Sequence, residues 1–379
     1  MGNKEHILQW NCRGFRINST FLDILINTYH PSIICLQETY IPENESDKMS
    51  KADSYRGYKK YFCNFHGDLP YNDSHHGVAI FVDTNFYPVS DQINFNFNAQ
   101  SFQYLAVTVS KSTKTFTVCS LYRPHRQHLV LHELQTLASR LPTSSIVMGD
   151  FNAKSLVWGN SESNKSGDIM ELFLQNSDYT LYNDKSHTYI HPAYNTPSTL
   201  DLTLASPRLF LDYSWKVLDD SHGSDHFPIL LMSTENSEPD HIPKAKLSKA
   251  NWEFLQNQCI NTMEVNPESD DAMESFTNQL IEIMEDSIPK TSTKTKHPKP
   301  WFTPEVRESV QKGKALQRRC RRIPSAENKQ LLRVWRAKTR RVVRQNKRKS
   351  WRKYVSNLTT RVKANRVWEM VRKISGKNS

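Results

Sequence analysis

The sequence lacks the marks of secreted and membrane-spanning proteins. No charged segment followed by an apolar one opens the chain, and no run of about 18 apolar residues occurs in it. We therefore expect a soluble, intracellular protein that makes no contact with a membrane. Its 379 residues exceed the length of one ordinary domain, so the sequence predicts two structural units.

Cysteine is scarce, with six residues and no C-x-x-C pair. This spacing does not fit a zinc site, and three of the cysteines lie in apolar, strand-like runs. We interpret all six as reduced residues, most of them in the core, and not as a disulfide framework. They are Cys12, Cys35, Cys63, Cys119, Cys259 and Cys320.

Acidic residues are almost absent from the C-terminal part of the chain. Residues 290–379 hold 29 Lys and Arg against 4 Asp and Glu, whereas residues 1–289 hold 21 against 35. The basic segment predicts contact with a polyanion, most simply nucleic acid, and the acidic part can hold a divalent cation. A solvated helical surface is the alternative interpretation of the basic segment.

Short apolar runs alternate with helix-like and loop stretches up to about residue 234. Two of these runs, at residues 105–109 and 116–121, flank a polar connection and predict a hairpin, so the sheets are at least partly antiparallel. The pattern indicates an α/β sandwich and not a doubly wound parallel sheet. Helices are expected where apolar positions recur every three or four residues, at about 19–28, 129–140 and 167–176.

Three segments follow from these patterns. Residues 1–234 form the predicted first domain, because the chain then turns polar and Pro239 and Pro243 break any helix. Residues 235–299 are expected to be a linker with amphipathic helices. Residues 300–379 are expected to be a basic helical segment.

The basic segment carries helix signals and tryptophans. Thr303, followed by a proline, is a predicted N-cap, and Ser325 is a second one. Trp335, Trp351 and Trp368 interrupt a field of Arg and Lys. We expect them to pack against a neighbouring helix or domain, with stacking on bases as the alternative.

Four strand ends carry polar groups. Taken singly, Asn11 fits a turn, Glu38 a surface charge and His226 a core histidine. Together the four ends supply what phosphodiester hydrolysis needs: oxygen ligands for a hard divalent cation, a group that polarises water and donors for the developing charge. The four ends are Asn11, Glu38, the Asp150 and Asn152 pair, and the Asp225 and His226 pair.

Two further residues extend this set. His226 serves as a general base only if its ring is oriented, and Asp201 is the candidate carboxylate that orients it. Tyr122 and Arg123 stand at the end of the hairpin's second strand, where both can meet a phosphate. A rim aromatic is the alternative interpretation of Tyr122.

An ordered set of motifs resembles the endonuclease/exonuclease/phosphatase superfamily: W-N-C-R-G, L-Q-E-T, L-Y-R-P, G-D-F-N, L-D-L and S-D-H-F-P. The resemblance covers about residues 5–232 and implies a DNase I-like, four-layered α/β sandwich of two packed sheets flanked by helices. Residues 152–154 and 158–159, together with residues 122–124, are similar to the apurinic-like endonuclease domains of LINE-type non-LTR retrotransposons, particularly the jockey-like group.

The basic segment is similar to the part of those polyproteins that precedes the reverse transcriptase. No Tyr-x-Asp-Asp polymerase motif occurs. The resemblance therefore implies an N-terminal fragment or a truncated copy, with the polymerase absent.

The resemblance also implies a role for each candidate residue. Glu38 and Asn11 would hold Mg²⁺, with Mn²⁺ as the alternative ion. His226 would activate water, with Asp201 behind it. The other residues would act at the phosphate or support the rest: Asp150 at the leaving oxygen, Asn152 and Tyr122 at the phosphate, and Asp225 beside the metal or His226.

The implied function is a magnesium-dependent endonuclease that nicks DNA and leaves a 3′-hydroxyl to prime reverse transcription. Its expected partners are a DNA target and, through the basic segment, retrotransposon RNA. We expect it in the nucleus, with assembly in the cytoplasm as an alternative. The competing functions are an apurinic/apyrimidinic repair nuclease, a small-substrate phosphatase and an inactive nucleic-acid-binding module. Repair enzymes often carry an acid at the position of Arg13, so this arginine argues for nicking without lesion preference.

Overall fold

The computed structural model of the chain describes residues 5–42, 45–46, 49–50, 55, 57–63, 76–111, 114–234, 250–262, 272–287 and 299–356. The chain divides into two compact units, of which one comprises Lys4–Asn236 with Pro298–Ser379 and the other Met1–Asn3 with Ser237–His297. The smaller unit contains α6 (Trp252–Thr262) and α7 (Ala272–Ser287). No helix in these ranges is both long and apolar enough to span a bilayer. Trp368 lies outside the described residues.

Two six-stranded sheets form the centre of the larger unit, as far as its described residues show. The first sheet is built from β1 (His6–Asn11), β2 (Ile33–Gln37), β3 (Tyr58–Cys63), β4 (Val78–Asp83), β13 (Tyr213–Val217) and β14 (Ile229–Ser233), in the order β13-β14-β1-β2-β4-β3. The second is built from β5 (Val89–Ile93), β6 (Gln103–Lys111), β7 (Lys114–Tyr122), β8 (Ser145–Asp150), β9 (Thr180–Leu181) and β12 (Asp201–Ala205), in the order β5-β6-β7-β8-β12-β9. A separate short pair joins β10 (Tyr189–Ile190) to β11 (Pro197–Ser198).

The strand pairings agree with the expected mixed character of the sheets. β6 and β7 form the predicted antiparallel hairpin, whereas β1 runs parallel to β2 and β7 parallel to β8. Gly149 allows β8 to pass close to β7, because a Cβ at this position would lie 1.8 Å from the carbonyl oxygen of Leu121. Glycine is therefore required one residue before Asp150, where β8 ends.

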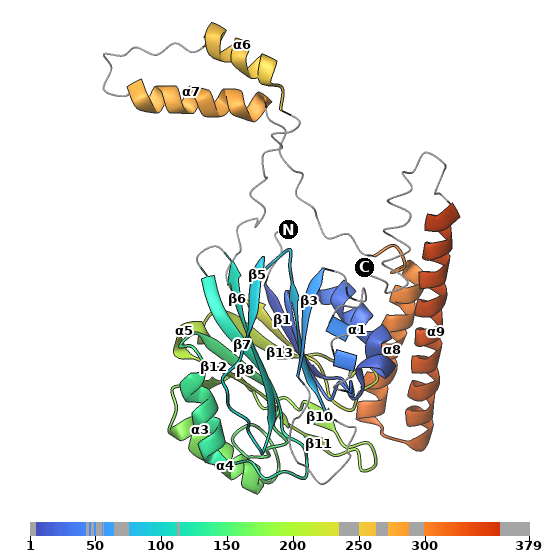
Figure 1. Ribbon diagram of the computed structural model, residues 1–379. Coiled ribbons are helices and arrows are strands. Elements are labelled where there is room, and N and C mark those ends of the chain that lie inside the picture. The colour runs from blue at the N-terminus through green and yellow to red at the C-terminus, as the bar shows by residue number, and fades with distance from the viewer. Residues whose placement is uncertain are drawn as a thin grey trace. The chain divides into compact units, whose positions relative to one another are not determined.

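Helices flank the two sheets of the unit (Figure 1). Three apolar clusters hold these layers together. The first lies between the sheets and includes Ile7 and Ile146. The second joins the outer face of the first sheet to α1 (Phe15–Tyr29), and the third joins the outer face of the second sheet to α3 (Leu131–Arg140) and α4 (Lys165–Gln175). The predicted four-layered α/β sandwich is confirmed. All six cysteines are free, and four of them are buried, as expected for reduced core residues.

Two C-terminal helices pack on the first sheet's side of the sandwich. These are α8 (Pro304–Arg322) and α9 (Ala326–Ser356), which contact each other along their length. Thr303 accepts a hydrogen bond from the amide of Val306, which confirms the predicted N-cap. Val306 and Val343 lie in the same apolar cluster as α1, so we call α8 and α9 together the docked hairpin.

Trp335, in α9, packs against α8 within the docked hairpin, which confirms its expected packing against a neighbouring helix. Its indole nitrogen donates to the backbone oxygen of Ser309, 2.8 Å away. Gly313 faces the indole, and a Cβ there would meet it at 3.6 Å. Trp351, by contrast, is exposed near the end of α9.

Candidate active site

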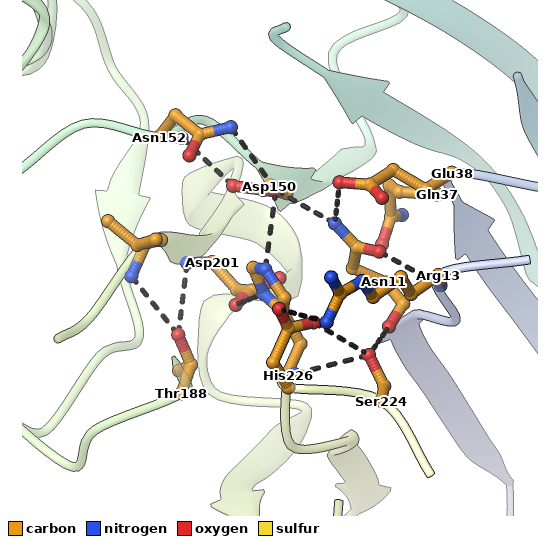
Figure 2. Close-up of polar contacts among 12 residues, drawn as sticks. Asn11, Arg13, Gln37, Glu38, Asp150, Asn152, Thr188, Asp201, Ser224 and His226 are labelled. Atoms are coloured by element: carbon orange, nitrogen blue, oxygen red, sulfur yellow. Dashed lines mark hydrogen bonds and ion pairs between the residues drawn. The ribbon is translucent and has the colours of Figure 1, made fainter. Parts of the chain in front are cut away.

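The polar strand ends gather at one edge of the sandwich. Asn11 at the end of β1 pairs with Gln37 at the end of parallel β2, and Asp150 at the end of β8 pairs with Asp201 at the start of antiparallel β12. Strands that end or begin at one edge deliver their side chains to a common place. His226, shortly before β14, joins them, and Figure 2 shows these side chains pointing toward one another.

His226 and Asp201 form a buried dyad. Nδ1 of His226 lies 2.8 Å from Oδ2 of Asp201, and the other oxygen of Asp201 accepts a hydrogen bond from Gln9 at 2.8 Å. The hydroxyl of Thr188 accepts from the Asp201 amide and fixes its backbone. With Nδ1 committed to the carboxylate, Nε2 is left for chemistry and lies 3.7 Å from Oδ2 of Asp150.

Asn11 links two carboxylates. Its side-chain nitrogen donates to Oε1 of Glu38 and to Oδ2 of Asp150, each at 2.9 Å. The second oxygen of Glu38 accepts from the hydroxyl of Tyr40 at 2.5 Å. Glu38 has a φ of 51°, a backbone conformation that residues other than glycine rarely adopt. The chain therefore leaves β2 through a strained turn at Glu38.

Asn152 supports Asp150 and turns the chain after β8. Its amide donates to Oδ1 of Asp150 at 3.0 Å, and its side chain donates to the carbonyl of Arg123 at 2.8 Å. The guanidinium of Arg123 is buried and donates to the carbonyls of Phe151 and Asn152. The expectation that Arg123 meets a phosphate is therefore wrong, because backbone carbonyls already take up its donors.

Tyr122 and Asp225 border this group of residues. Tyr122 is almost fully buried, and burial followed by the charge of Glu38 raises the pKa of its phenol well above the usual range. Asp225 forms an ion pair with Arg13, with 2.9 Å between Oδ2 and Nη1. Tyr189, in β10, places its ring 4.8 Å from that of His226.

Negative charge is in excess at the site and shifts the pKa values of its residues. Burial lowers the pKa of His226, but the charges of Asp201 and Asp150 outweigh it and raise this pKa to about 10. Burial raises the pKa of Asp150 to about 7, against the opposing charge of His226 and with the help of Asp201 and Glu38. Compensation of this negative charge would bring the pKa of His226 back toward the range that suits a general base.

The donor atoms fit a hard divalent cation. Glu38 and Asp150 offer carboxylate oxygens, which Mg²⁺ and Mn²⁺ prefer, on either side of the Asn11 side chain. The side-chain nitrogen of Asn11 contacts both carboxylates, while its oxygen accepts from the amide of Arg13 at 3.2 Å, so Asn11 would have to turn its amide to become a ligand. A second set, Asp150, Asp201 and His226, has ligand atoms within 4.8 Å of one another. Its Asp201 and His226 atoms are engaged in the dyad, so the first set is the better candidate.

Several residues of the site escaped the sequence interpretation. Gln9 donates to Gln37 at 3.1 Å as well as to Asp201, and Gln37 donates to Ser120 at 2.9 Å. These side chains carry the polar network into the space between the sheets. The alternation of strand residues was the available signal, since Gln9 lies two positions from Ile7 and thus on its core-facing side.

The chain resembles known proteins along much of its length. Residues 116–230 match the family model described as endonuclease-reverse transcriptase. The RNA-directed DNA polymerase from mobile element jockey of Drosophila melanogaster is 24% identical over 297 residues, which are 74% of this chain and 30% of that protein. The probable RNA-directed DNA polymerase from transposon X-element of the same species is 22% identical over 286 residues, which are 72% and 30%.

Among solved structures, the endonuclease domain of TRAS1, a telomere-specific non-LTR retrotransposon, is similar with a TM-score of 0.49 and 19% identity. That likeness covers 61% of this chain and 98% of the solved one. The chain spans about 30% of the length of the two polymerases. The family match and these two relatives confirm the resemblance seen in the sequence.

Proposed function

Because the chain contains an endonuclease domain of the endonuclease/exonuclease/phosphatase superfamily, akin to those of LINE-type elements, we propose that it nicks DNA in a divalent-metal-dependent reaction. The observation that carries this proposal is the position of the dyad. His226 presents Nε2 beside Asp150, and Asn11 joins Asp150 to Glu38. A base, an acid and a set of cation ligands therefore share one edge of the sandwich.

Each residue then has a task in hydrolysis. Nε2 of His226 takes the proton of the attacking water, while Asp201 holds Nδ1 and stabilises the imidazolium that forms. Asp150 supplies a proton to the leaving 3′-oxygen, and its burial, which raises its pKa, favours the protonated form that this task needs. Asn152 and Tyr122 steady the phosphate. When bound by Glu38 and Asn11, Mg²⁺ or Mn²⁺ supplies Lewis-acid stabilisation of the phosphoryl oxygens.

The biological role is proposed from the named relatives. Both are RNA-directed DNA polymerases from mobile elements. We propose that the 3′-hydroxyl left by the nick primes reverse transcription, that the retrotransposon RNA binds the basic C-terminal segment, and that the reaction takes place in the nucleus. Asp225, which forms an ion pair with Arg13, would help position the metal or His226.

The purified full chain is expected to convert supercoiled plasmid to the open circle with Mg²⁺, and to stop when EDTA removes the metal. Mn²⁺ should restore the activity. A DNA polymerase should extend the nick without prior phosphatase treatment, which reports a 3′-hydroxyl. Undiminished nicking in EDTA would contradict the metal requirement. Strong preference for an abasic duplex would favour a repair nuclease instead.

The outer surface of the docked hairpin suits nucleic acid. Its exposed basic side chains lie outside the apolar cluster that holds the hairpin in place. Such a surface gains affinity by releasing counterions from the phosphate backbone. Among the exposed basic residues, Arg321 contacts the ring of Phe227 and is not counted on this surface. The others are Arg307, Lys312, Arg318, Arg319, Arg322, Arg333, Lys338, Arg341, Arg344, Arg348, Lys349, Arg352 and Lys353.

Substitution of Arg318, Arg319 and Arg322 by glutamine is expected to flatten the salt dependence of nucleic-acid affinity. Each phosphate of duplex DNA that the protein no longer neutralises lowers the slope of log K against log salt by about 0.9. Fluorescence anisotropy between low and moderate salt measures this slope on DNA and on RNA.

A matched variant controls for net charge alone. Lys165, Arg208 and Lys216 are exposed basic residues of the sandwich. Their replacement by glutamine removes the same charge and should change the slope much less. Equal slopes for the two variants would mean that the hairpin surface is not the binding face.

A further inference from the structure

We propose that Arg336 is a positioning residue of the nuclease, through which the docked hairpin holds the segment carrying His226 in its working position. This inference rests on the proposed function, because it assigns a task within the same site. It gives the basic C-terminal segment a second role. Its outer surface meets nucleic acid, and its inner surface completes the enzyme.

Arg336 points inward from α9. One of its terminal nitrogens donates to the hydroxyl of Ser221 at 2.9 Å and to the side-chain oxygen of Gln317, in α8, at 2.7 Å. The same nitrogen lies 3.6 Å from Oδ1 of Asp220. The Arg336 side chain is 18% exposed and that of Asp220 9%, so water competes little for these contacts. Arg336 is thus committed to the sandwich and is not free to bind phosphate.

Ser221 passes this contact on to His226. Its hydroxyl accepts from Arg336 and donates to the carbonyl of Ser224 at 2.7 Å, and the Ser224 amide donates back to the carbonyl of Ser221 at 3.0 Å. The hydroxyl of Ser224 accepts from the amide of His226 at 3.2 Å and donates to the carbonyl of Asn11 at 2.8 Å. One buried serine therefore separates Arg336 from the turn that fixes His226 against Asn11.

The segment between these serines needs such support. His222 has a φ of 50° and Gly223 a φ of 96°. A Cβ on Gly223 would lie 2.5 Å from the side-chain oxygen of Asn18, so the segment is folded tightly against α1. Backbone held in sparsely populated conformations persists only where its surroundings impose it. Asp220 contributes by accepting from the amide of His222 at 2.9 Å.

A second contact lies on the other side of His226. The guanidinium of Arg321, in α8, lies 4.5 Å from the ring centroid of Phe227, the residue after His226. This distance is that of a cation–π interaction. The docked hairpin therefore touches the chain both before and after His226, and its two helices contribute one contact each.

Arg336→Gln is expected to lower the single-turnover rate of plasmid nicking by about 10-fold to 100-fold, because small displacements of a catalytic group are that costly. The KM for DNA should change less than about 2-fold, since the groups that bind phosphate are untouched. Arg336→Lys keeps the charge beside Asp220 but has no planar fork, so it should recover part of the rate.

Ser221→Ala tests the same path without burying an unpaired charge, and it keeps the question open to experiment if Arg336→Gln does not fold. Its loss of rate should not add to that of Arg336→Gln, because both remove one path. In a His226→Ala background, Arg336→Gln should cause no further loss. Gln345→Ala, an exposed change on α9, is the control and should leave the rate unchanged.

The outcomes separate the two proposals. A wild-type chain that does not nick DNA refutes the proposed function itself. If the wild type nicks, full activity of both Arg336→Gln and Ser221→Ala overturns the positioning role. A loss confined to KM, or one that persists undiminished in the His226→Ala background, also overturns it, because Arg336 would then act independently of His226.

Discussion

Replacement of His226 by alanine is expected to lower the rate of DNA nicking by at least about 100-fold, as removal of a general base does. Nε2 of His226 lies 3.7 Å from Asp150, while Nδ1 is held by Asp201 at 2.8 Å. The ring is therefore oriented before substrate arrives. The rate should be measured under single-turnover conditions with saturating Mg²⁺.

His132→Ala is the matched control, because His132 is exposed on α3. It should nick at the wild-type rate. The loss in His226→Ala should appear in the rate at saturating DNA and not in KM, because His226 is buried and contributes little to binding the ground state. Full activity of His226→Ala would remove this residue from the mechanism and leave the dyad as a structural feature.

The central strands could be predicted from the sequence, whereas the edge strands could not. β2, β4 and β8 are buried along their whole length and appear as apolar runs. β3, β5 and β13 lie at the ends of the two sheets. β5, for example, has the sequence Val-Ser-Asp-Gln-Ile and is largely exposed, because one side of an edge strand faces solvent and needs no apolar residue.

The motifs indicated the chemistry of the site but not its hydrogen-bond partners. Asn11, Glu38 and Asp150 stood out as polar groups after buried strands, and the structure brings them within hydrogen-bond distance. Which partner each takes depends on contacts far apart in the sequence. Arg123 illustrates the limit, because its local motif suggested phosphate binding, while the fold surrounds it with the carbonyls of the segment after β8.

The inner face of the docked hairpin was predictable in principle. Its buried positions recur with the spacing of one helix face: Val306, Ser309, Gly313, Gln317 and Cys320. The high density of Arg and Lys indicated a nucleic-acid-binding segment. The buried positions of α8 are small or polar, so they do not form the apolar pattern by which a buried helix face is usually recognised. The number of charged residues describes a whole helix, whereas packing of α8 on the sandwich depends on the residues of one face.

Asp150→Asn is expected to lower the nicking rate by about 100-fold or more, because the amide can neither release a proton nor carry the negative charge that faces His226. Asp150→Asn should also make the metal-free protein more stable than the wild type above neutral pH. Burial raises the pKa of Asp150 in the folded state to about 7, from an ordinary value of 3.8.

Proton linkage determines whether ionisation of Asp150 stabilises or destabilises the fold. Between about pH 4 and pH 7 the folded chain binds more protons at Asp150 than the unfolded chain does, so ionisation of this group progressively reduces stability as pH rises, and the reduction is complete above pH 7. The asparagine side chain of the variant does not ionise. In EDTA, the thermal midpoint of Asp150→Asn minus that of the wild type should therefore increase from pH 5 to pH 8.

Asp178→Asn, at an exposed position after α4, is the control for both measurements and should change neither. A lower midpoint for Asp150→Asn at pH 8 would show that the charge of Asp150 stabilises the fold through His226 and outweighs its burial. Together, a slower enzyme and a more stable fold are the signature of a carboxylate retained for chemistry at a cost in stability.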